Sequence, residues 1–267
     1  MLKDITLGQY YQTDSVLHRL DPRVKLAGTF LYILSLFIVA DARGYVVAFV
    51  FLALCVGLSQ VPLRFIFRGM RSIYFLLALT ITFNLFLTPG EEIWRFHFLA
   101  ITREGARTAS LMGIRLIFLI TGSSLMTFTT TPNQLTDGLE RLLRPLRLFH
   151  VPVHEIAMMM SIALRFIPIL MEETDKIMKA QIARGADFES GSIMQRARAL
   201  VPLLVPLFIS AFRRANDLAL AMEARCYHGG EGRTKMKPLK YAGRDLGAYG
   251  ILAGYLLCCI VLGRWIG

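Results

Sequence analysis

The chain has 267 residues, of which 55% are hydrophobic, and its mean hydropathy is +0.51. This apolar content exceeds that of soluble globular proteins and indicates an integral membrane protein. The net charge of +11 lies on basic residues placed between apolar runs. That placement is typical of cytoplasmic flanks that face anionic lipid and acidic partners, and it argues against nucleic-acid binding.

Five apolar segments approach the length of about 20 residues that a helix needs to cross the hydrocarbon core. They are residues 26–40, 44–63, 72–90, 108–128 and 246–263. Lys25 flanks the first segment and is expected to extend its ammonium group to the interface. Arg115 lies inside the fourth, where we expect it first to reach the interface and, as an alternative, a protein partner.

The basic flanks predict the orientation of these spans in the cell (plasma) membrane. The N-terminal 23 residues are too polar to hold the apolar core of a signal peptide, so a cytoplasmic N-terminus is expected. By the positive-inside rule, two clusters of arginines mark cytoplasmic sides, one after the second span and one after the fourth: Arg64, Arg68, Arg71, Arg141, Arg144 and Arg147.

Residues 131–243 have a helical pattern but are expected to be too charged to span, since their longest charge-free run, 199–212, contains two prolines. We therefore predict an all-α membrane protein with about five transmembrane helices in three parts. An N-terminal membrane domain (1–130) holds four spans, a cytoplasmic helical arm covers 131–243, and a C-terminal span covers 244–267. Within the arm we expect three helices: one from Pro152 to Gly185 bent at Pro168, one beginning near Ser192, and one from Pro206 to the glycine pair 229–230.

Two helix ends in the arm repeat one pattern, an arginine between small residues after an amphipathic run. They read Ile182-Ala183-Arg184-Gly185 and Glu223-Ala224-Arg225-Cys226. Small neighbours allow a partner backbone to approach, and a guanidinium offers planar donors to carboxylates or carbonyls in a groove. The alternative is that each arginine only satisfies the last carbonyls of its own helix. The repetition favours docking.

These paired ends resemble the coupling helices of the transmembrane T component of energy-coupling factor (ECF) transporters, the EcfT/CbiQ family. Three other stretches resemble the same family: residues 18–25 (HRLDPRVK), residues 131–135 (TPNQL) through Pro145-Leu146, and residues 164–168 (LRFIP). The likeness covers nearly the whole chain. Cys226 departs from it, because family members often carry glycine there.

The resemblance implies a coupling subunit without catalytic activity or a cofactor of its own. Two cytoplasmic ABC ATPase subunits, of EcfA and EcfA′ type, would bind ATP and magnesium, and a membrane S component would capture a vitamin or micronutrient. Arg184 and Arg225 would each dock into one ATPase, with Ala183, Gly185, Ala224 and Cys226 as their small neighbours. Closure of the ATPase pair would then reorient the S component.

Other residues of the resembling stretches have less specific expectations. Met158, Met159, Met160 and Leu164 resemble the surface that carries the S component, although packing within the subunit is an equal alternative. Asp21 and Pro22 can cap and begin a helix, so we assign Asp21 and Arg23 a structural role first. Arg165, close to Pro168, can pair with Glu172, with Glu173 or with a carboxylate elsewhere, and its role is left open.

Other classes of membrane protein fit the sequence less well. A membrane-embedded enzyme would need converging ionisable residues, but the five histidines are scattered and no HExxH, GxSxG or Walker A sequence occurs. A secondary transporter would usually contain inverted repeats and broken helices. A closer alternative is a T component dedicated to a cobalt, nickel or biotin system, whereas the two intact arginine ends favour a shared component.

Overall fold

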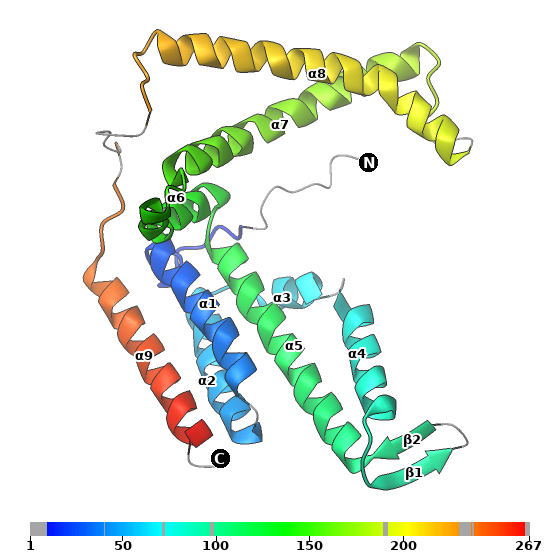
Figure 1. Ribbon diagram of the computed structural model, residues 1–267, viewed down its shortest axis with the longest axis vertical. Helices are drawn as coiled ribbons and strands as arrows, with labels where there is room; N and C mark the ends of the chain where they lie inside the picture. Colours follow the sequence, from blue (N-terminus) through cyan, green and yellow to red (C-terminus); the bar gives the residue numbers. More distant parts are fainter. Residues whose placement is uncertain are drawn as a thin grey trace. The chain divides into compact units, whose positions relative to one another are not determined.

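The computed structural model describes residues 10–39, 41–70, 73–96, 99–188, 192–229, 236 and 238–264 (Figure 1). The described residues divide into two compact units, one within residues 10–139 and 239–264 and the other within residues 140–238. The described residues of the predicted N-terminal domain and of the predicted C-terminal span thus share one unit, while the exact bounds of the three predicted parts stay a prediction. Arg71 and Gly230 lie outside the described residues.

The first unit is a helix bundle. Its helices are α1 (Pro22–Ile38), α2 (Ala42–Ser59), α3 (Leu63–Met70), α4 (Tyr74–Leu87), α5 (Arg103–Thr129), most of α6 (Pro132–Leu142) and α9 (Gly243–Arg264). A buried core joins α1, α2, α5 and α9 through residues such as Tyr32, Leu36, Tyr45, Phe118 and Tyr255. These elements correspond to the five predicted spans, with ends that differ by up to five residues, so the all-α membrane fold is confirmed.

The start of α1 has the predicted local structure. The carboxylate of Asp21 accepts a hydrogen bond from the Arg23 amide and caps the helix, and Pro22 occupies the first turn, where its missing N–H is not needed. Close packing then depends on a glycine in α5. A Cβ at Gly122 would lie 2.7 Å from the Tyr32 ring, so a larger side chain there would separate α1 from α5.

One element was not predicted. Between α4 and α5 the chain forms an antiparallel hairpin of β1 (Glu92–Phe96) and β2 (Leu99–Thr102), in which Trp94 pairs with Ile101 and Phe96 with Leu99. The alternation of apolar and polar residues from Trp94 to Phe98 is a two-residue period, which is the signal for a strand.

The second unit consists of a 3-10 turn (η3, Arg144–Phe149) and two long helices, α7 (Val153–Ala183) and α8 (Ile193–Glu223). The predicted bounds of the first arm helix are confirmed. The division of residues 192–229 into two helices is wrong, because α8 continues through Pro202 and Pro206. Its end at the glycine pair is also wrong, since α8 stops at Glu223.

The set of helices able to span a membrane differs from the predicted set. Among the described residues five pass by length and composition, or six if α3 and α4 form one bent span. They are α2, α5, α9 and both arm helices, whereas α1 has only 17 residues. The expectation that the arm is too charged to span fails by this criterion, because α7 and α8 each contain an 18-residue window with no more than two charged residues.

Candidate functional site: two arginine-bearing helix ends

The end of α7 is a compact backbone cap. Gly185 has a φ of +88°, in the left-handed region that glycine adopts without strain. The Gly185 amide donates to the Ile182 carbonyl at 2.9 Å, and the Ala186 amide donates to the Gln181 carbonyl at 3.0 Å. This is the Schellman arrangement, which satisfies the last helical carbonyls with backbone donors. Arg184 lies at the turn, immediately before the glycine.

The end of α8 repeats this geometry. Cys226 has a φ of +54° and takes the place of the glycine. Its amide donates to the Glu223 carbonyl at 2.8 Å, and the Tyr227 amide donates to the Met222 carbonyl at 3.0 Å. Arg225 stands directly before the residue of positive φ, as Arg184 does. The short sequence repeat is therefore a structural repeat, and a non-glycine residue at position 226 carries the backbone strain.

The two arginine side chains are not used by the fold. All six residues of the Ala-Arg-Gly and Ala-Arg-Cys ends are exposed, and neither guanidinium hydrogen bonds to another described residue. Because backbone amides already satisfy the last carbonyls, the alternative that Arg184 and Arg225 serve as caps of their own helices has no support in this geometry. Both guanidinium groups keep their full set of donors for a partner.

Helices α7 and α8 pack antiparallel, so that the two ends point away from each other. The Glu173 carboxylate accepts hydrogen bonds from the Ser210 hydroxyl at 2.5 Å and from Arg214 Nη2 at 2.9 Å. Near the end of α7, the side-chain amide of Gln181 donates from Nε2 to the Pro202 carbonyl at 3.5 Å. Pro206 has no N–H to bond that carbonyl, so the side chain from α7 replaces the missing helical bond.

The contact between the helices has the same sequence spacing as the ends. Glu173 and Arg214 are 41 positions apart, which is also the separation of Arg184 and Arg225. On one side of this contact an apolar groove runs toward the end of α8, lined by residues that include Ile162 and Met222. From Ile162 to Gln181, α7 rises by roughly 28 Å, so the two arginine ends are separated by at least about that distance along the helix axis.

The other predicted site residues have varied environments. Met159 and Met160 are exposed, as the S-component surface would require, whereas Met158 and Leu164 are half-buried. Arg165 and Pro168 are exposed, and among the described side chains none forms an ion pair with Arg165. Of the carboxylates left open as partners of Arg165, Glu173 pairs instead with Arg214.

Asp21 and Arg23 have the structural role assigned to them. Arg23 forms an ion pair with Asp21 at 2.8 Å and lies 3.9 Å from the centre of the Tyr241 ring. The Asp21 amide donates to Asp245, which is 2% exposed and also accepts from the Ala242 amide. Asp245 thus ties α9 to α1. Sequence analysis missed it, although an acid directly before the last apolar run is a signal for a helix start.

His18, in the stretch before α1, is held by contacts of both its ring nitrogens. Its Nε2 lies 3.0 Å from the Tyr11 carbonyl, and its Nδ1 lies 2.7 Å from the Ser15 hydroxyl. A proton on Nε2 donates to the carbonyl and leaves Nδ1 to accept from the hydroxyl. Partial burial disfavours the charged ring and lowers the pKa of His18 below its usual value.

Arg115 reaches partners within the protein. Its Nε donates to the Tyr45 hydroxyl at 2.8 Å and its Nη2 to the Val39 carbonyl at 3.2 Å, close to the connection between α1 and α2. The alternative of a protein partner is therefore confirmed over simple extension to the interface. No group of three histidine, cysteine or acidic residues suited to a metal ion occurs within the described ranges.

A bundle with helices able to span a membrane, together with a pair of long helices that end in exposed arginines, defines the class of helical membrane protein. The family profile described as "Cobalt transport protein" (CbiQ) matches residues 13–236. The chain is 53% identical over 270 residues to the energy-coupling factor transporter transmembrane protein EcfT of Clostridium kluyveri, covering all of both chains. It is 46% identical to the Bacillus subtilis protein of the same name, covering 92% of this chain and 93% of that one.

The chain therefore belongs to the family of ECF transporter transmembrane T components. Its relatives are named as transporter transmembrane proteins, which agrees with a subunit that is not itself an enzyme.

Proposed function

We propose that this chain is the coupling subunit of an ECF-type importer in the cell membrane. It links ATP hydrolysis by two cytoplasmic ABC ATPase subunits to the reorientation of a membrane S component that carries a vitamin or micronutrient. The observation that carries the proposal is the pair of structurally equivalent helix ends, each presenting a guanidinium that the fold does not use. Its N-terminus and both arginine ends would then lie on the cytoplasmic side.

The geometry of the helix pair favours two separate docking partners. An arginine fork binds carboxylates or carbonyls best inside a groove that excludes water. Ends separated by roughly 28 Å or more along the helix axis reach grooves on two different subunits more readily than a single groove. Each of the two ATPases would therefore take one arginine end.

The contact around Glu173 supports a lever mechanism. Two long helices that are joined near the middle transmit a displacement at their ends to the crossing point. Movement of the ATPases toward each other would draw the arginine ends together and change the angle between α7 and α8. The exposed Met159 and Met160 on α7 would carry that change to the S component, since methionine surfaces adapt to a moving partner.

Co-purification tests this proposal. The tagged chain is purified in detergent from its native host, and bound proteins are identified by mass spectrometry for the wild type, Arg184→Glu, Arg225→Glu and the double variant. Arg213→Glu is the matched control, because Arg213 is exposed on α8 but lies away from both ends. Each single reversal should release one ATPase subunit and the double reversal should release both, while the control keeps them. Retention of both ATPases by the double variant would contradict the proposal.

A further inference from the structure

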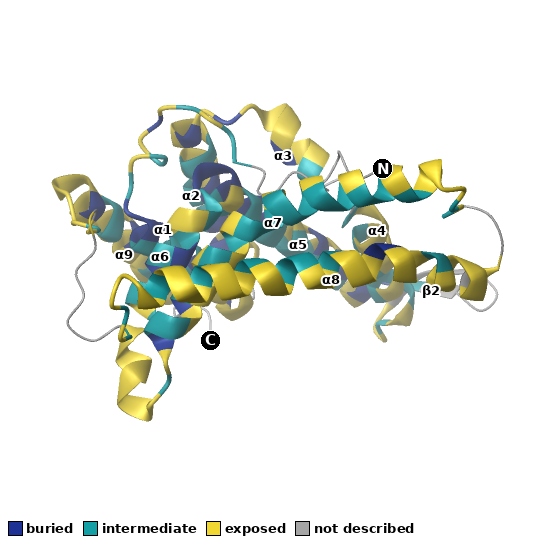
Figure 2. Ribbon diagram, turned by 90° about the horizontal axis from the view of Figure 1, so that it is seen from above, coloured by how far each residue is buried: buried dark blue, intermediate teal, exposed yellow. Residues whose placement is uncertain are grey.

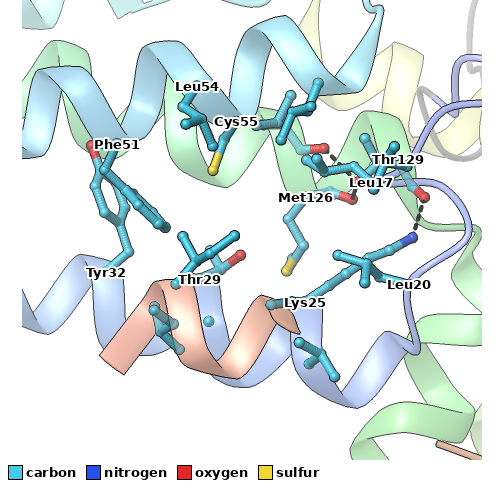
Figure 3. Close-up of a pocket in the computed structure, with 18 of the residues that line it drawn as sticks. Leu17, Leu20, Lys25, Thr29, Tyr32, Phe51, Leu54, Cys55, Met126 and Thr129 are labelled. Carbon is cyan, nitrogen blue, oxygen red and sulfur yellow. Dashed lines mark hydrogen bonds between the residues drawn. The ribbon is translucent and has the colours of Figure 1, made fainter. Parts of the chain in front are cut away.

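The helix bundle contains an apolar cavity of about 310 Å³ between α1, α2, α5 and α9. Figure 3 shows Leu54 and Cys55 of α2 facing Lys25 and Thr29 of α1 across this space, with Met126 extending into it. The cavity has the volume of a small-molecule site. A volume of this size holds a single extended acyl chain, whereas a partner helix with its side chains is about 10–12 Å across.

The rim of the cavity opens to the side of the bundle. Leu54 and Leu58 on α2 and Ile251 on α9 line the cavity and are 46%, 40% and 53% exposed. The opening thus lies between two helices that are long and apolar enough to span the membrane, where lipid chains surround the protein. Water is a poor occupant, because a buried water needs two to four polar partners and almost the whole lining is apolar.

One end of the cavity is positively charged. Lys25 is only 8% exposed, and its ammonium group donates to the carbonyls of Thr129 at 2.8 Å and His18 at 3.2 Å. An ammonium group has three donors, and the third has no partner among the described residues. Arg244, which also lines the cavity, is exposed, and its side chain forms no hydrogen bond within the part of the chain that the structure describes.

The acids at this end are already engaged. Asp21 pairs with Arg23 and caps α1, and Asp245 accepts backbone amides at the start of α9. Asp14, whose carboxylate also interacts electrostatically with Arg244, pairs with Arg19. Among the described side chains, four cations, Arg19, Arg23, Lys25 and Arg244, therefore face the three carboxylates of Asp14, Asp21 and Asp245. The remaining positive charge next to an apolar cavity matches an amphiphile with an anionic head and an apolar chain.

We propose that this cavity binds one acyl chain of an anionic phospholipid, with the lipid phosphate against Arg244 and Lys25. The chain enters between α2 and α9, and its head stays at the interface. The site is formed by the helix bundle and includes neither arginine end of α7 or α8, so it is independent of the docking proposal.

Two glycines of α9 provide a matched test. A Cβ at Gly247 or at Gly254 meets no other atom within 4 Å, so each position has room for a larger side chain. Gly247 lines the cavity, and Gly254, two helical turns farther along, does not. Gly247→Leu fills the cavity, whereas Gly254→Leu adds the same side chain to the same helix elsewhere. Leu58→Trp, at the half-exposed rim, is a second blocking variant.

The measurement is native mass spectrometry of the full chain with its co-purifying partners, after delipidation and titration with phosphatidylglycerol or phosphatidylcholine. We expect the wild type and Gly254→Leu to retain one phosphatidylglycerol, and Gly247→Leu and Leu58→Trp to retain about tenfold less. Arg244→Gln should abolish the preference for phosphatidylglycerol over phosphatidylcholine.

Three results would overturn the proposal. They are equal lipid retention by Gly247→Leu, Leu58→Trp and Gly254→Leu, no lipid retained by the wild type, or an unchanged headgroup preference in Arg244→Gln. Co-purification of the ATPases is recorded in the same spectra. If Gly247→Leu and Leu58→Trp lose lipid but keep both ATPases, the result supports the lipid site and says nothing about docking. Loss of ATPases from the Arg184 and Arg225 variants tests docking separately.

Discussion

Replacing Gly185 with alanine is expected to loosen the end of α7 without creating a clash. The Gly185 φ of +88° lies where an L-residue is strained by about 1–2 kcal/mol. Alanine recovers about 0.4–1 kcal/mol by restricting the unfolded chain. A Cβ at this position would meet nothing within 4 Å, so the net penalty of about 1 kcal/mol arises from the backbone alone.

The opposite substitution applies at the end of α8. Cys226 has a φ of +54°, so Cys226→Gly removes strain from an equivalent cap and should stabilise it by a fraction of that amount, about 0.5 kcal/mol. The two substitutions should therefore change the stability of the helix caps in opposite directions, although the two ends share one backbone geometry.

Hydrogen exchange of the backbone amides measures both effects. The Ala186 amide, bonded to Gln181, should exchange about fivefold faster in Gly185→Ala, and the Tyr227 amide, bonded to Met222, about twofold slower in Cys226→Gly. Gly229→Ala is the control, because it introduces alanine at another glycine of positive φ (+101°) with open space around it, outside both caps. Unchanged exchange at Ala186 in Gly185→Ala would refute the assigned cap geometry.

Three further predictions concern other contacts. Glu173→Gln removes the charge that binds Arg214. Because the pair is partly exposed, the free energy of unfolding should fall by no more than about 1 kcal/mol, whereas the rate of ATP-driven transport should fall by a larger factor than this loss of stability explains. A transport loss no larger than the loss of folded protein would contradict a lever at this contact. Asp21→Ala removes the α1 cap and should lower the free energy of unfolding by about 1–2 kcal/mol in chemical denaturation, whereas no change would exclude the capping role. The lowered pKa of His18 means that its neutral form contributes stability above the unfolded-state pKa, which is lost as the pH falls through the folded-state pKa. The protection of amides around Tyr11, measured relative to their intrinsic exchange rates at each pH, should therefore fall on acidification, and His18→Gln should remove that dependence.

Local signals in the sequence predicted much of the helix bundle. Asp21 and Pro22 define the start of α1 because capping depends on neighbours in the chain. The end of α7 at Gly185 was predicted for the same reason. The partner of Arg115 was left open, because Tyr45 and Val39 approach it only through the packing of α1, α2 and α5.

The errors in the arm have a different origin. Pro202 and Pro206 predicted a break, yet α8 is continuous and exposes most of its surface (Figure 2). The carbonyl that Pro206 leaves without a helical donor is bonded by Gln181 from α7, and such a distant partner is not visible in the local sequence. Glu173 was one of the carboxylates left open for Arg165 because it is near in the chain, but it lies on the face of α7 that meets Arg214.

The candidate site was predicted more fully from the sequence than the helices of the arm were. Both arginine ends were identified from four residues each, and the structure adds that their backbone caps are equivalent. The departure at Cys226 was noted as a difference from glycine. Its positive φ gives that difference a physical meaning, since the position favours glycine whatever the role of the thiol.

The most direct test of the coupling account is the number of ATPase subunits bound per chain. Native mass spectrometry of the purified complex should find two ATPases with the wild type, one with Arg184→Glu or Arg225→Glu, and none with the double variant. Two ATPases bound to all four proteins, or both lost together from either single variant, would contradict the claim that each arginine end docks one ATPase.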